Sequence, residues 1–234
     1  MILFLGVLAI IGALKGETRI LILQILLIII ATSILDLIIA YIKKKKFLFP
    51  SSAIISGLFI GGILAPNQKF YVYLTAVIVT ILSKHLIKIN KKHIFNPAAF
   101  GLIFVSILFR TSLNWWIDSL VWLVLIFGLF MAYKMRRFHL ILSFVIPFEV
   151  LMLIYTIINK LTFGHLLLIN LFLVFFMLVE PVTSPIKKNS RIIFGIIAAI
   201  AAFILFHYLP AYDPFLTSLL IANLFIPLFN KKMI

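Results

Sequence analysis

Ten apolar runs, separated by short polar or basic segments, account for most of this chain of 234 residues. An α-helix needs about 20 apolar residues to cross a bilayer, and lipid tolerates only helices or closed barrels as spanning structures. The apolar–polar alternation of barrel strands is absent. Because 65% of residues are hydrophobic and only 12% are charged, the sequence predicts an all-α polytopic membrane protein with no room for a soluble domain. The expected spans lie at roughly residues 1–14, 20–42, 47–66, 70–87, 95–110, 115–133, 138–158, 161–184, 192–209 and 214–230.

The basic residues alternate between the loops that connect these runs. Even-numbered loops and the C-terminal tail hold 16 of the 21 Lys and Arg residues, whereas odd-numbered loops hold 5. The positive-inside rule then predicts that both termini and all even-numbered loops lie in the cytoplasm. The expected location is the cell inner membrane. The net charge of +15 therefore indicates loops that orient the helices and meet anionic lipid headgroups, and it does not indicate nucleic-acid binding.

Two helix starts of the same kind, Asn96-Pro97 and Asp213-Pro214, suggest an internal duplication. Each combines a good N-cap residue with a Pro at the first helical position, where its missing N–H costs nothing. The first start lies on the predicted inner side and the second on the outer side. Two halves of five spans each have opposite orientations, which is the usual inverted-repeat arrangement. The expected halves of this single membrane domain are residues 1–112 and 113–234.

Three carboxylates in or beside the apolar runs are candidates for an ion pathway, because ionisable residues are costly in lipid. Asp36 lies in the second run, and Glu149 lies in the seventh run just after Pro147. Glu180 lies at the inner end of the eighth run. A carboxylate in mid-membrane is expected to be protonated or paired with a cation. The alternative is that Asp36 and Glu180 pair with loop lysines.

The third run carries a stripe of small residues. Ala53, Gly57 and Gly61 recur every four residues, with Ser52 and Ser56 beside them. Such a stripe lets another helix backbone approach closely. It could also form a wall for a planar cofactor or a permeating ion, and the two interpretations are compatible.

Several kinds of chemistry are excluded by what the sequence lacks. It contains no cysteine, which excludes disulfides, thiolate iron–sulfur ligation and cysteine catalysis. No Gly-rich phosphate loop, nucleophile elbow or metal-ligand cluster is visible. The residues alone therefore leave two classes open: a transporter, or a subunit of an ion-coupled redox complex.

Four groups of residues, in order along the chain, resemble the RnfD/NqrB family, the membrane subunits of the Rnf and sodium-pumping Nqr electron-transfer complexes. They are Ser51–Leu58, Ile94–Ala99, Glu180–Pro185 with Ile192–Gly195, and Leu220–Asn223. The resemblance is closest to RnfD and runs from about Gln24 to Lys231. In the family the Pro-Val-Thr-Ser motif usually begins with Asp, and Glu180 keeps the carboxylate here.

This resemblance implies ten helices in two inverted five-helix repeats, similar to the urea and ammonium transporters. It implies a subunit of a translocating oxidoreductase that works with other Rnf/Nqr-type membrane subunits. Such complexes move electrons between carriers on the two sides of the membrane while Na⁺ or H⁺ moves. Asp36 and Glu180 would then be the cation-side carboxylates. The residues expected to shape the broken helix ends at the repeat interface are Asn96, Pro97, Pro181, Thr183 and Ser184. The residues expected to bind a cofactor are Ser52, Gly57, Asn96, Pro97, Thr183 and Ser184.

The resemblance also implies flavin, and here the sequence departs from the family pattern. Family members carry FMN esterified to a Thr in a Ser-Gly-Ala-Thr-like motif, on an outer segment between the halves. The corresponding segment is Arg110–Asp118, which has no Gly and has Thr111 as its single Thr. We therefore predict no covalent FMN, and we expect that FMN or another flavin, where bound, is held non-covalently.

The leading hypothesis is an RnfD-like membrane subunit that takes part in transmembrane electron transfer. The alternative is a small-solute or ion transporter or channel on the same scaffold without redox chemistry. A third hypothesis is an assembly subunit that holds its partners together. A flavin absorbance spectrum separates the first hypothesis from the other two.

Overall fold

The computed structural model describes residues 1–15, 18–44, 49–89, 92–162, 168–209 and 212–230. Most of them are helical, and the strands among them are the short pair β1 (Lys88–Ile89) and β2 (Lys92–His93). Contacts divide the chain into two compact units. One is Met1–Lys88 with Pro97–Leu123, and the other is Ile89–Asn96 with Val124–Ile234. The loop residues Lys45, Lys46, Lys91, Lys231 and Lys232, which contribute to the predicted topology, lie outside the described ranges.

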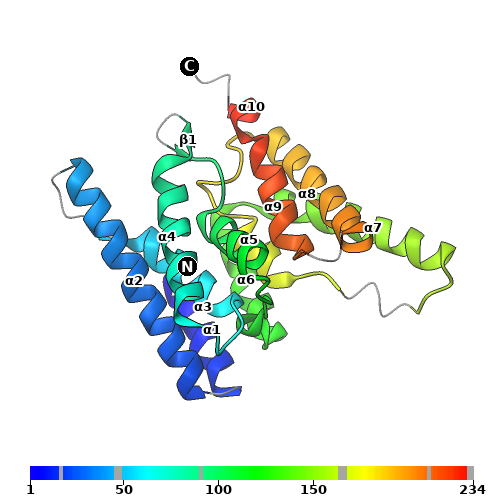
Figure 1. The fold of residues 1–234 in the computed structure, drawn as a ribbon. Coiled ribbons are helices and arrows are strands. Elements are labelled where there is room, and N and C mark those ends of the chain that lie inside the picture. Colours follow the sequence, from blue (N-terminus) through cyan, green and yellow to red (C-terminus); the bar gives the residue numbers. More distant parts are fainter. Residues whose placement is uncertain (16–17, 45–48, 90–91, 163–167, 210–211, 231–234) are drawn as a thin grey trace. The chain divides into compact units, whose positions relative to one another are not determined.

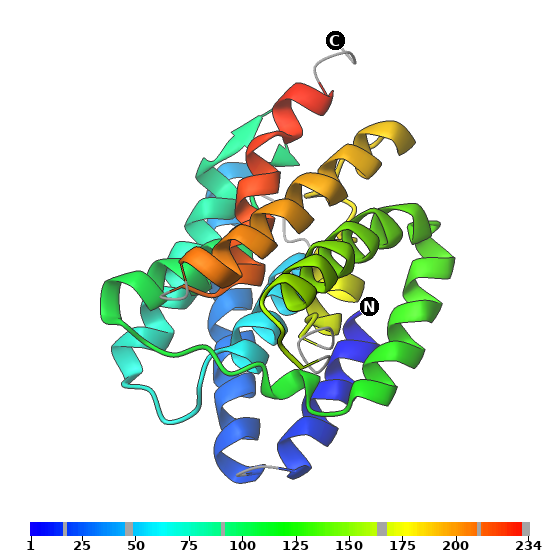
Figure 2. The same cartoon turned by 90° about the vertical axis from the view of Figure 1, so that its right-hand side faces the viewer.

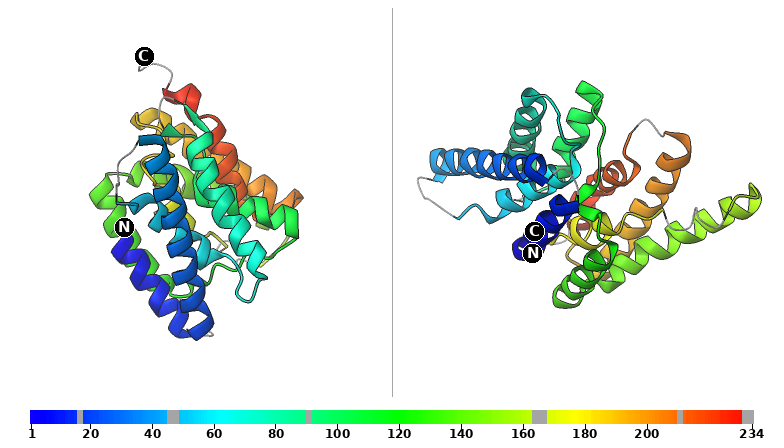
Figure 3. Two further views of the ribbon diagram at one scale, coloured as in Figure 1. Left: turned by 60° about the vertical axis from the view of Figure 1, so that its left-hand side comes forward. Right: turned by 90° about the horizontal axis from the view of Figure 1, so that it is seen from below.

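The first unit is built on a long helix, α2, that packs against α3 and α4 (Figures 1 and 3). A Cβ on Gly57 would lie 2.7 Å from Thr32 Oγ1, and a Cβ on Gly61 would lie 3.0 Å from Ile25 Cγ1, both on α2. The small-residue stripe therefore brings α3 close to α2. The elements are α1 (Ile2–Lys15), α2 (Thr18–Lys44), α3 (Ser51–Ile63), α4 (Phe70–Leu86), α5 (Pro97–Phe109) and the 3₁₀ turn η1 (Trp116–Asp118).

In the second unit α8 packs against both α7 and α9 (Figure 2). Its core is aromatic: Phe144, Phe148, Phe176 and Phe194 are almost completely buried. Gly128 of α6 faces Phe175, and a Cβ there would collide with that ring. The elements are α6 (Val121–Met135), α7 (Phe138–Ile158), the π-helical turn η3 (Leu173–Met177), α8 (Lys188–Tyr208), α9 (Pro214–Leu224) and α10 (Ile226–Asn230).

The predicted all-α polytopic membrane protein is confirmed. Among the described residues three helices are long and apolar enough to cross a membrane: Ile20–Lys43, Phe138–Ile158 and Lys188–Tyr208. Shorter apolar helices accompany them over most of the other predicted runs. Large apolar side chains remain exposed on these helices, such as Leu27 at 62% and Ile30 at 53% on α2. Lipid tails cover such faces at no cost, whereas water would not.

Two predicted spans are wrong as continuous helices. In the eighth, 161–184, the described helical residues are 171–177, followed by a turn at 178–179, and residues 163–167 lie outside the description. Asn170 Oδ1 accepts the Leu173 N–H at 2.7 Å at the start of these turns, and the residue before Pro181 is disfavoured in helical conformation. The tenth splits at Phe225 into α9 and α10, because Pro227 has no N–H to continue the ladder.

The two predicted helix starts are found where they were expected. Pro97 is the first residue of α5, and Pro214 is the first residue of α9. Asp213 Oδ1 accepts the Leu216 N–H at 2.7 Å, which is a side-chain cap. Contacts divide the chain differently from the predicted halves, because residues 89–96 cluster with the second unit and 113–123 with the first. The inverted duplication itself stays a prediction.

Candidate functional site

Residues 180–187 form a non-helical segment between the π turn and α8. Thr183 and Ser184 within it are only 1% and 2% exposed. Pro181 and Pro185 cannot donate backbone hydrogen bonds, so the segment cannot continue the preceding helical turns. Its buried polar groups therefore need partners on neighbouring elements.

Four residues of the second unit close a ring of hydrogen bonds around this segment. Asn96 Nδ2 donates to Glu180 Oε2 at 2.8 Å, and Thr183 Oγ1 donates to the same oxygen at 3.1 Å. The Asn96 backbone N–H donates to Asn223 Oδ1 at 2.9 Å, and Asn223 Nδ2 donates to the Thr183 carbonyl at 2.9 Å. Asn96 and Asn223 are completely buried. The ring thus joins the residue before α5, the segment 180–187 and α9.

Two arginines hold the far end of the same segment. Ser184 Oγ donates to the Glu180 carbonyl at 2.7 Å and accepts from Arg137 Nη1 at 2.7 Å. The Pro185 carbonyl accepts from Arg191 Nε at 2.9 Å and more weakly from Arg137 Nη1 at 3.5 Å. Arg137 immediately precedes α7, and Arg191 lies in the first turn of α8. The starts of both helices are therefore fixed to the segment.

The Arg137 guanidinium is charged although it is buried. Burial, with a smaller effect from the nearby charge of Arg191, lowers the pKa of Arg137 to about 10. That value is still well above neutral pH, so the side chain keeps all its donors under physiological conditions. Among the described residues it has no carboxylate ion partner, and it meets a hydroxyl and a carbonyl oxygen.

Of the predicted site residues, Asn96, Thr183, Ser184 and Glu180 come together in this network. Their polar groups bond to one another or to Arg137, so in this conformation they fix the chain path. Pro97 has the predicted role of starting α5.

Ser52 and Gly57 belong to the other compact unit. Gly57 faces Thr32 and Ile29 of α2, which fill the space that a planar ligand would need on that side. Ser52 is half-buried in the first turn of α3, and its carbonyl accepts from Ser56 Oγ at 3.1 Å. The packing interpretation of the small-residue stripe therefore accounts for Gly57 without a ligand.

Asp36 has two basic partners on α4. Lys84 Nζ lies 2.9 Å from both carboxylate oxygens, and His85 Nε2 lies 2.7 Å from Oδ1. Lys43 Nζ reaches the His85 carbonyl at 3.4 Å. This is the alternative that the sequence left open, in which Asp36 pairs with a lysine. A metal or sodium ion at Asp36 would have to displace Lys84.

Glu149 differs from the other two carboxylates. It is half-buried near the middle of α7, and it makes no hydrogen bond or ion pair with any residue that the structure describes. No group of three or more His, Cys, Asp or Glu able to hold a metal ion occurs among the described residues.

Sequence reasoning missed Asn223 and Arg137 as members of the site. In the sequence Asn223 belongs to one of the four groups of residues that resemble the family, and Arg137 is one of the basic residues of the even-numbered loops. A signal for Asn223 existed, because an Asn inside an apolar run needs a buried partner. A signal for Arg137 was weaker, since a basic residue at the start of a span is ordinarily exposed.

The segment Arg110–Asp118, which corresponds to the flavin-attachment segment of the family, is linked to α5 through Thr111. Thr111 Oγ1 donates to the Val105 carbonyl at 3.2 Å, and the Thr111 carbonyl accepts from Ser106 Oγ at 3.1 Å. These two bonds link Thr111 to the last two turns of α5. The absence of covalent FMN at Thr111 stays a prediction.

The comparison with known proteins identifies the family. A sequence profile of the NQR2, RnfD, RnfE family matches the chain twice, over residues 1–121 and 116–234. A comparison with curated protein sequences gives no significant match. The two profile matches together cover the full length, and the ring joins the Asn-Pro and Pro-Val-Thr-Ser motifs on which the resemblance to the family rests. The chain belongs to the NQR2, RnfD, RnfE family and is a membrane subunit of the kind found in Rnf/Nqr-type complexes.

Proposed function

We propose that this chain takes part in transmembrane electron transfer as the RnfD-like subunit of an Rnf/Nqr-type complex. The observation that carries the proposal is the family match over the whole chain, together with the direct bond between its two motifs at Asn96 and Glu180. We place the chain in the cytoplasmic membrane with both termini inside. The contact of Arg137 with the Pro185 carbonyl supports one part of this topology, the position of the sixth and eighth loops on the same side of the membrane. The basic residues of the even-numbered loops favour the cytoplasm as that side.

In this proposal the ring of hydrogen bonds holds the non-helical segment 180–187 in a fixed position. Irregular backbone at membrane depth is tolerated only where protein satisfies its polar groups. Asn223 and Arg137 do this for the segment 180–187 through the Thr183 carbonyl and the Ser184 hydroxyl. If the ends of these helices are fixed, a redox group held by this chain or by a partner subunit would stay at a constant distance from the next redox group.

Any flavin on this chain would be bound non-covalently. The hydroxyls of Thr183 and Ser184 already have partners, and the hydroxyl of Thr111 donates to the Val105 carbonyl of α5, so we assign no flavin contact to these residues. When bound, a flavin would supply one- and two-electron transfer.

The test is a flavin absorbance spectrum of the detergent-purified complex with its partner subunits, before and after acid precipitation. We expect acid precipitation to release the flavin from this chain. We expect Thr111→Ala to leave the spectrum unchanged. Flavin that stays with this chain in wild type but not in Thr111→Ala would overturn the non-covalent assignment. Complete absence of flavin from the intact complex would reject electron transfer by this subunit and favour a transporter or assembly role.

For ion coupling we propose Glu149 as the responsible carboxylate. Asp36 is paired with Lys84, and Glu180 accepts two bonds in the ring, whereas Glu149 has no partner among the described residues. A carboxylate in lipid must be neutralised by a proton or a cation. We expect Glu149→Gln to abolish the Na⁺ or H⁺ dependence of turnover in membrane vesicles and Glu149→Asp to retain part of it. Unchanged ion dependence in Glu149→Gln, with the complex intact, would rule this residue out.

A further inference from the structure

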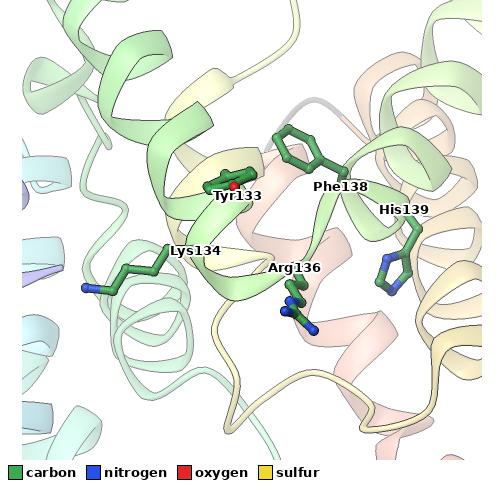
Figure 4. A pocket seen from close by; sticks show the side chains of 5 residues that line it. All are labelled: Tyr133, Lys134, Arg136, Phe138 and His139. Carbon is green, nitrogen blue, oxygen red and sulfur yellow. The ribbon is translucent and has the colours of Figure 1, made fainter.

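The turn between α6 and α7 borders an open cavity that the ring does not use. Its volume is about 520 Å³. Figure 4 shows Arg136 and His139 extending from the turn in the same direction, while Lys134 extends away from them. The residues that line it are Tyr133, Lys134, Arg136, Phe138 and His139.

Several basic residues lie close to this cavity. His139 lies within electrostatic reach of Arg191, Lys188 and Arg137, and Arg191 Nη1 is 3.4 Å from His139 Nε2. Within the part of the chain that the structure describes, no carboxylate forms an ion pair with any of these basic residues or with Arg136. The cavity therefore offers uncompensated charge to an external anion.

Two helices begin beside this charge. The N-cap residues of α7 and α8 are Arg137 and Lys187, and neither provides a side-chain cap for its helix. A helix N-terminus carries about half a positive elementary charge and free N–H groups, which favour anions. The helix dipoles and the basic side chains therefore both favour the binding of an anion.

We propose that this cavity binds the phosphate headgroup of an anionic phospholipid. The turn joins two apolar helices, so it lies at a boundary between lipid and water. Tyr133 and Phe138 are 74% and 39% exposed, and aromatic residues at that depth contact the glycerol and upper acyl regions. Arg136 and His139 would meet the phosphate. Basic pockets between helices at the cytoplasmic surface have this selectivity for acidic headgroups.

The test is native mass spectrometry of the complex containing the full-length chain, delipidated and titrated with phosphatidylglycerol or phosphatidylcholine. We expect phosphatidylglycerol to bind preferentially and the double variant Arg136→Gln/His139→Gln to weaken it. Loss of one cationic group near a membrane surface corresponds to about a fivefold weaker interaction, so the double variant should be roughly 5–25-fold weaker.

The matched control is Arg110→Gln. Arg110 is exposed and has φ 52°, close to the φ 53° of Arg136, so both substitutions meet the same left-handed backbone. We expect this control to bind phosphatidylglycerol like wild type. Equal binding of the two lipids, or an equal loss in the control and the double variant, would overturn the proposal. Displacement of the lipid by millimolar inorganic phosphate would instead assign the cavity to a soluble phosphate compound.

Discussion

Asn223→Ala is the sharpest test of the ring. The side chain is completely buried, and it accepts the Asn96 N–H and donates to the Thr183 carbonyl, both at 2.9 Å. Its removal leaves two buried backbone groups without these partners, at about 1–3 kcal/mol each in soluble proteins. Double-mutant cycles within membranes give a lower mean of about 0.6 kcal/mol per bond. We therefore expect a loss of about 1–4 kcal/mol in the free energy of unfolding, the upper part of this range applying where no water enters.

The assay is thermal unfolding of the detergent-purified protein, followed by size-exclusion chromatography. For a chain of this length 1 kcal/mol corresponds to about 2–4 °C, so the expected loss lowers Tm by roughly 2–16 °C. Asn159→Ala is the matched control, because Asn159 is exposed and makes one bond to the Tyr155 carbonyl; its Tm should change by no more than about 2 °C. Equal shifts in the two variants would refute the ring as a stabilising unit.

Two further perturbations test the packing and the ion pair. Gly128→Ala should destabilise the chain by about 1–3 kcal/mol, because the new methyl group collides with Phe175. Gly6→Ala is the control, because nothing lies within 4 Å of the added Cβ, and it should be neutral or stabilising in the same thermal assay. Asp36→Asn should cost about 2 kcal/mol, below the value for a fully buried pair because Lys84 is 13% exposed and can reach water. A Tm that does not fall in Asp36→Asn would mean that the pair contributes no stability.

The positions of most helices could be predicted because lipid imposes a simple rule on them. A run of apolar residues bounded by charges must be a spanning helix, since no other open structure satisfies its backbone in lipid. The seventh run, 138–158, coincides with α7. The starts of α5 and α9 could be predicted because Pro is favoured at the first helical position, and at α9 Asp213 also caps the helix.

The eighth run shows where that rule fails. Its composition is as apolar as that of the others, but the described helical residues end before Pro181. The break is stabilised by hydrogen-bond partners that are distant in sequence, so no local sequence pattern reveals them. Asn96 lies 84 residues from Glu180 and 127 from Asn223 in sequence. A break in a span could be anticipated from Pro181, whereas its stabilisation depends on tertiary contacts.

The three acidic candidates illustrate the same division between what sequence and structure determine. Residue type and depth indicate that a charged carboxylate at Asp36, Glu149 or Glu180 is energetically costly in lipid. They do not reveal which of the three carboxylates is stabilised by partners. Lys84 offsets the charge of Asp36, and Asn96 with its neighbours stabilises Glu180. A group that binds a mobile proton or cation must be able to exchange it, and fixed partners oppose that exchange. By this reasoning a carboxylate with no partner among the described residues is a better candidate for the proposed ion coupling than one in a ring or an ion pair, and Glu149 is that carboxylate.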